Sequence, residues 1–72
     1  MQDQRRLVKM ANQIADNFSF HDDAVERTLN HLQRFWASSM HRKIVDFEAA
    51  GGDGLNATAR AAVQRLAEQA SR

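Results

Sequence analysis

The chain has 72 residues, a formal net charge of +1, and neither cysteine nor proline. This length allows one domain, and a domain of this size buries only about 60% of the surface that its unfolded chain exposes. The missing thiols exclude a disulfide, a thiolate metal site and a cysteine nucleophile. The balanced charge disfavours nucleic acid as a partner, and no apolar run approaches the roughly 18–20 residues of a membrane span. We therefore expect a single cytoplasmic domain over residues 1–72.

Hydrophobic periodicity predicts an all-α fold, a small bundle of three to four short helices. The first helix is expected over residues 3–17, since one face carries apolar side chains at the helical spacing: Leu7, Met10, Ala11, Ile14, Ala15 and Phe18. The second is expected over residues 24–36, with Asp22 or Asp23 as its N-cap. Asp23 and Arg27 have the spacing of a surface ion pair.

A third helix is expected over residues 39–50, and the second and third are either continuous, kinked or separate near Ser38. All three glycines lie within Gly51-Gly52-Asp53-Gly54. One of them is expected to adopt the left-handed conformation that ends a helix. Asn56 is then a suitable N-cap for a last helix over residues 57–69, whose small alanines would allow a neighbouring helix to approach closely.

Residues for chemistry are scarce. His21, His31 and His41 are ten residues apart, so no two of them share a helical turn, and no H-E-x-x-H motif is present. The glycine segment matches neither of two phosphate-binding patterns, G-x-x-x-x-G-K-S/T and G-x-G-x-x-G, and no predicted strand precedes it. We predict no catalytic, cofactor-binding or metal-binding residue in this chain.

A cluster of large side chains is the best candidate for a partner interface. It comprises Phe35, Trp36 and Met40, with Arg42 nearby in a small basic patch. Tryptophan, phenylalanine, methionine and arginine are enriched at protein interfaces. Trp36 taken alone is better explained by core packing. So small a bundle cannot easily bury every aromatic ring, however, and we expect at least one large apolar side chain to remain for a partner.

These residues carry a resemblance to a known family. LVKMANQIADNF (residues 7–18), HLQRFWASSMHRKI (31–44) and EAAGGDGLNATARAAVQRL (48–66) resemble the small delta subunit, FdsD-like, of NAD-dependent, molybdenum-containing formate dehydrogenases. The matching positions include Asn12 and Gln13 in the first block and Gly51, Gly52, Gly54 and Leu55 in the third.

The chain also departs from the family pattern. The family often has a proline and an arginine between the tryptophan and the methionine, where this chain has Ala37, Ser38 and Ser39. It also often has an acidic residue and a proline after the turn, where Asn56 and Ala57 stand here. The first departure puts any contact made by that arginine in doubt. Both departures leave helix boundaries less sharply defined than a proline would make them.

The resemblance implies a non-catalytic accessory subunit without a cofactor, which stabilises or helps to assemble a complex. Its partner would be the molybdenum-containing catalytic subunit of formate dehydrogenase. An alternative is a transient assembly factor for cofactor insertion into that subunit, and a remote one is a small helical nucleic-acid-binding protein. When isolated, the chain is expected to form a homo-oligomer that hides its apolar surface.

Overall fold

The computed structural model describes residues 2–70, with the side chains of residues 4–69; Met1, Ser71 and Arg72 lie outside the described part. Four helices follow one another: α1 (Gln2–Asn17), α2 (Ala24–Phe35), α3 (Ser38–Ala49) and α4 (Ala57–Ala70). The all-α prediction is confirmed, and each helix begins and ends within one residue of its predicted bounds. None of these helices combines the length and apolar character that crossing a bilayer requires.

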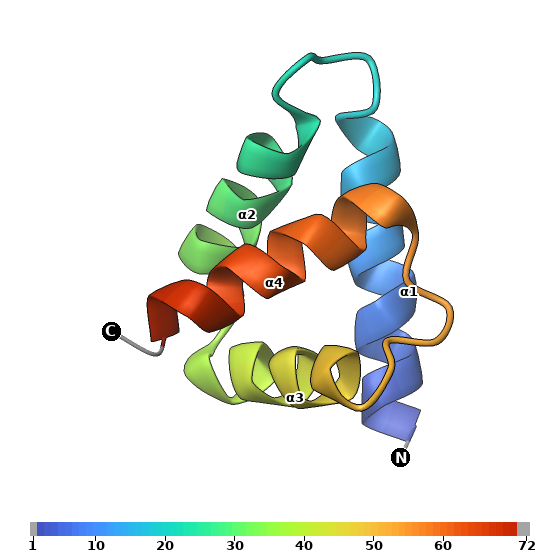
Figure 1. Cartoon of the computed structure of the whole chain (residues 1–72), viewed down its shortest axis with the longest axis vertical. Helices are drawn as coiled ribbons and strands as arrows, with labels where there is room; N and C mark the ends of the chain where they lie inside the picture. Colours follow the sequence, from blue (N-terminus) through green and yellow to red (C-terminus); the bar gives the residue numbers. More distant parts are fainter. Residues whose placement is uncertain (1, 71–72) are drawn as a thin grey trace.

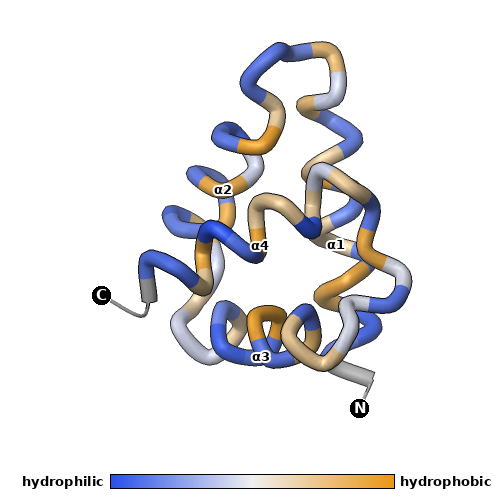
Figure 2. The backbone as a smooth tube through the Cα atoms, in the orientation of Figure 1, coloured by the Kyte–Doolittle hydropathy of each residue, from blue (hydrophilic) through white to orange (hydrophobic). Residues whose placement is uncertain are grey.

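Helix α4 holds the bundle together. It crosses in front of α1 and α2, lies beside α3 and contacts all three, while α1 and α2 form a hairpin and α3 closes the base (Figure 1). Ala59 and Ala62 of α4 are completely buried, which confirms the predicted close approach of neighbouring helices. Hydrophobic and hydrophilic residues alternate along each helix (Figure 2), and all four helices contribute to one apolar core. The core consists of Leu7, Val8, Ala11, Ala15, Leu29, Leu32, Trp36, Ile44, Leu55, Ala59, Ala62, Val63 and Leu66.

Helices α2 and α3 are separate. Trp36 (φ −93°, ψ 141°) and Ala37 (φ −70°, ψ 158°) have extended backbones and turn the chain between them. The carbonyl of Leu32 accepts hydrogen bonds from the backbone N–H of Trp36 and from the Nε2–H of His41. The His41 ring thus joins the first turn of α3 to the end of α2 and fixes the angle between them.

The glycine segment ends α3 as predicted. The Gly52 N–H donates to the Phe47 carbonyl and the Gly51 N–H donates to the Glu48 carbonyl, which is the Schellman pattern. Gly51 and Gly52 both have positive φ, at 131° and 64°. The guanidinium of Arg60 donates to the carbonyls of Gly51 and Gly52 at 3.0 and 2.9 Å, so α4 supports the turn that precedes it.

The two predicted N-caps have different outcomes. Asn56 caps α4 as expected, because its Oδ1 accepts a hydrogen bond from the Ala59 N–H at 2.8 Å. Asp23 precedes α2, but its side chain does not bond to a backbone N–H at that helix end. Its Oδ1 instead accepts the Arg27 Nε–H at 2.7 Å. The ion-pair prediction is therefore confirmed, and Asp23 occupies the predicted N-cap position of α2. The expected bond from its carboxylate to a backbone N–H is wrong, because the carboxylate binds Arg27 instead.

Candidate functional site

The most exposed aromatic ring on a helix is that of Phe35, at the end of α2. The residue is 69% exposed. His31, one turn earlier, lies against it with ring centroids 4.8 Å apart, and Phe18 meets His31 edge-on at 6.4 Å. We call Phe18, His31 and Phe35 the aromatic face. They border a shallow hollow of about 200 Å³ between the end of α1 and α2.

Cations border the aromatic face. The Arg34 guanidinium lies 5.9 Å from the centroid of the Phe35 ring, a cation–π distance. Arg27 lines the same hollow and pairs with Asp23. The hydrogen bond from Arg27 lowers the pKa of the Asp23 carboxyl below its ordinary value. This surface therefore combines an exposed ring with positive charge.

The four residues predicted as one interface lie on different surfaces. Trp36 is only 6% exposed and belongs to the core, which agrees with the core packing expected for this residue alone and removes it from the candidate interface cluster. Met40 is half-buried in a hollow between α1 and α3. Arg42 is exposed and lines a groove between α2, α3 and α4. Only Phe35 lies on the aromatic face, because the extended backbone after α2 turns the chain into the core.

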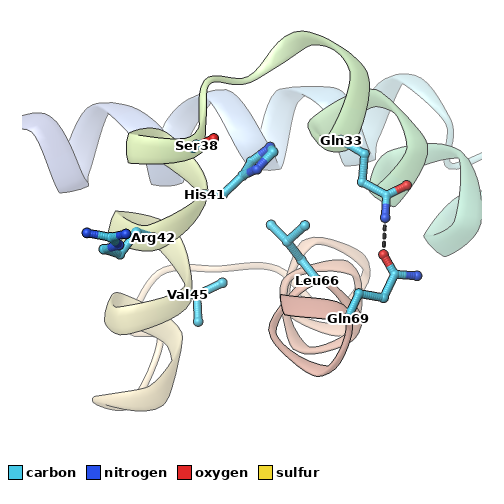
Figure 3. A pocket seen from close by; sticks show the side chains of 7 residues that line it. All are labelled: Gln33, Ser38, His41, Arg42, Val45, Leu66 and Gln69. Carbon is cyan, nitrogen blue, oxygen red and sulfur yellow. Dashed lines mark hydrogen bonds between the residues drawn. The ribbon is translucent and has the colours of Figure 1, made fainter. Parts of the chain in front are cut away.

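That groove has a volume of about 640 Å³, and Figure 3 shows the side chains that line it. Gln33 of α2 and Gln69 of α4 hydrogen-bond across one end of it. The other side chains that line it come from α3 and α4: Ser38, His41, Arg42, Val45 and Leu66.

The family-motif positions of the first and third blocks meet in space. The Asn12 Nδ2 donates to the Gly54 carbonyl at 2.8 Å, and the Asn12 Oδ1 accepts the Asn56 N–H at 2.9 Å. Leu55, between these two partners, is buried at 7% exposure. Asn12 thus ties α1 to the loop before α4, whereas the neighbouring Gln13 is exposed. The two blocks form one structural unit.

The histidines make packing contacts. His41 bonds to a backbone carbonyl, His31 lies between two phenylalanine rings, and His21 lies 6.3 Å from Phe18. Within the described residues, no three side chains of histidine, cysteine, aspartate or glutamate gather as a metal would require.

The sequence model of the NADH-dependent formate dehydrogenase delta subunit family, FdsD, matches residues 6–63. The chain belongs to this family. The match includes all of α2 and α3, most of α1 and the first half of α4. Comparisons with curated proteins and with solved structures found no match. The family name confirms the sequence-based resemblance and associates the chain with a formate dehydrogenase complex.

Some of these contacts join residues that are too far apart in the sequence for a local pattern to predict them. The Asn12 bonds join residues 42 and 44 positions apart, and the Gln33–Gln69 bond joins residues 36 apart, so no local pattern shows them. The contact of His31 with Phe35 did have a signal, because residues four apart share a helix face. The part of His41 in joining α2 to α3 was not predicted, because its partner, the Leu32 carbonyl, lies nine residues earlier on another helix.

Proposed function

We propose that this chain is a non-catalytic accessory subunit of a cytoplasmic, NAD-dependent, molybdenum-containing formate dehydrogenase. In this proposal it binds the catalytic subunit by protein–protein contact and stabilises or assembles the complex, without a cofactor of its own. The observation that carries the proposal is the exposed Phe35 ring in a member of the delta subunit family.

The Phe35 ring is exposed and is already contacted by neighbouring side chains, and both properties favour docking. Fully burying a phenylalanine side chain contributes about 1.5–3 kcal/mol relative to leaving it exposed. His31 and Arg34 already contact the Phe35 ring, so less side-chain freedom remains to be lost on binding. Aromatic and arginine side chains are the common anchors of interfaces. The aromatic face therefore has the composition of a docking site.

The non-catalytic part of the proposal is supported by how the reactive side chains are used. Each histidine is engaged in packing or in a backbone hydrogen bond. The arginines Arg27, Arg60 and Arg65 pair with carboxylates of this chain. The chain contains no cysteine. The side chains best suited to chemistry thus serve the fold.

The test is co-purification. All subunits of the formate dehydrogenase are co-expressed with a tag on the catalytic subunit, and the amount of this chain per catalytic subunit is measured by mass spectrometry. Wild type is expected in stoichiometric amount, and Phe35→Ser is expected to be depleted. Phe20→Ser is the matched control, since Phe20 is 91% exposed and lies in the loop between α1 and α2.

The outcomes separate the hypotheses. A stoichiometric wild-type chain in the active, finished enzyme supports a permanent subunit. A chain found only on immature, cofactor-free enzyme would establish the assembly factor instead. If the chain is absent from both forms, the proposal is wrong. In isolation, the exposed rings are expected to promote self-association, and a strictly monomeric mass in solution would contradict that part.

A further inference from the structure

The groove between α2, α3 and α4 has an apolar interior. Val45 of α3 and Leu66 of α4 face the space between their helices (Figure 3). Val45 is half-buried and Leu66 is 5% exposed, so an aliphatic group placed between them would contact apolar side chains of both helices. Burial of this kind favours a branched aliphatic side chain over a polar one.

The outer edge of the groove carries positive charge, since the Arg42 side chain lies on the side of α3 that faces away from Leu66 (Figure 3). Arg42 is exposed at its edge, and the hydroxyl of Ser38 lies one helical turn earlier on α3. No aspartate or glutamate is among the residues that line the groove. Among the described residues, Arg42 forms no ion pair, in contrast to Arg60, which pairs with Glu48 on the other side of the turn. A ligand that brings a carboxylate would complement this edge.

The walls of the groove are held before any ligand binds. The side-chain amides of Gln33 and Gln69 hydrogen-bond across the gap between α2 and α4. His41, in the wall formed by α3, bonds to the Leu32 carbonyl of α2. At the groove, polar bonds thus link α2 to α4 and α2 to α3, while the α3–α4 side is lined by the apolar Val45 and Leu66. A preformed groove reduces the entropy cost of binding.

We propose that this groove binds an acidic segment of the catalytic subunit. An aliphatic side chain of that segment packs between Val45 and Leu66, and a neighbouring carboxylate pairs with Arg42. The inference rests on the proposed function and adds a second docking surface to the aromatic face. We infer a protein segment as the ligand because the groove has an apolar interior and a single arginine at its edge. This combination fits an aliphatic side chain next to an acidic one.

The first test is binding of full-length variants to the formate dehydrogenase complex prepared without this chain. Arg42→Glu is expected to lower the affinity roughly tenfold or more, since it places like charges together. Arg42→Lys is expected to retain part of the affinity. Added salt is expected to narrow the difference in affinity between the wild type and Arg42→Glu, because it screens the charges. Lys9→Glu is the matched control, because Lys9 is an exposed cation on α1 outside the groove.

The binding results separate a failure of the proposed function from a failure of the groove inference. If the wild-type chain does not bind, the proposed function fails. If the wild-type chain binds, Phe35→Ser binds weakly and Arg42→Glu binds as well as Lys9→Glu, the proposed function stands and the groove inference is overturned.

The second test locates the ligand. Because the chain has no cysteine, Ser38→Cys provides a single thiol at the groove for a photoactivatable cross-linker. Lys9→Cys serves as the control position. We expect Ser38→Cys to cross-link to a segment of the catalytic subunit in which aspartate or glutamate adjoins leucine, isoleucine or valine. Cross-links to a basic segment, to a second copy of this chain, or to the same segment from Lys9→Cys would overturn the inference.

Discussion

The side-chain Oδ1 of Asn12 on α1 accepts a 2.9 Å hydrogen bond from the backbone N–H of Asn56, 44 residues later. The Nδ2 of Asn12 donates to the Gly54 carbonyl at 2.8 Å, so one amide satisfies a donor and an acceptor of the same loop. Asn56 in turn caps α4. The position of α4 on α1 therefore depends on a polar contact as well as on packing.

Asn12→Ala is expected to lower the free energy of unfolding by about 1–3 kcal/mol, because it leaves the Asn56 N–H and the Gly54 carbonyl without their partner. The measurement is urea denaturation followed by circular dichroism. Gln13→Ala is the control, since Gln13 is exposed, and should change the free energy by less than about 0.5 kcal/mol. Equal stability of the two variants would contradict the proposed tie.

Gly52→Ala is expected to destabilise the fold by about 1–2 kcal/mol or more. An alanine there must adopt φ +64°, and its Cβ would lie 3.0 Å from the Arg60 Nη1. A double-mutant cycle with Arg60→Ala separates the two causes. The contact contributes only while the guanidinium is present, so the cost of Gly52→Ala should fall in the Arg60→Ala background. An unchanged cost would assign the effect to backbone strain alone.

Trp36→Ala and Phe35→Ala are expected to differ sharply in stability. Removing the buried ring of Trp36 should cost about 3–5 kcal/mol, through lost burial and the cavity left behind. Removing the exposed ring of Phe35 should cost about 1 kcal/mol or less. Thermal and urea denaturation of the isolated chain measure both. A large loss of stability in Phe35→Ala would mean that the aromatic face serves the fold rather than a partner.

The pKa of Asp23 is expected to rise toward the ordinary aspartate value of about 3.9 in Arg27→Gln, because the hydrogen bond and charge that lower it are removed. The folded pKa lies below the unfolded one. The pair's contribution to stability is therefore present above the unfolded pKa and is lost as the pH falls through the folded pKa. Carboxyl chemical shifts in an NMR titration measure the change. An identical titration of Asp23 in both proteins would contradict the pairing.

Local signals determined the parts of the fold that the sequence predicted well. The apolar spacing of α1, the glycine turn and the Asn56 cap each depend on residues within a few positions of one another. The break between α2 and α3 has no proline or glycine, and its extended backbone follows from packing of Trp36 in the core. The sequence alone therefore left the continuity of these helices open.

The candidate site was predicted less well than the fold. Phe35, Trp36, Met40 and Arg42 are close in the chain, and closeness in the chain suggested one surface. The turn at Trp36 and Ala37 instead separates them onto the aromatic face, the core, the α1–α3 hollow and the groove. Which ring a small bundle leaves outside depends on long-range packing, and the periodicity of a single helix does not contain that information.

Trp36 is the single tryptophan of a chain that has no tyrosine, and it is enclosed where α2 ends. The intrinsic tryptophan fluorescence of this chain therefore comes from one buried ring and reports on the interior of the bundle. A ligand that covers Phe35 or Arg42 should leave the emission maximum nearly unchanged, whereas opening of the bundle should shift it to the red. The molecule thus carries an optical probe that distinguishes a variant that has lost its shape from one that has only lost its partner.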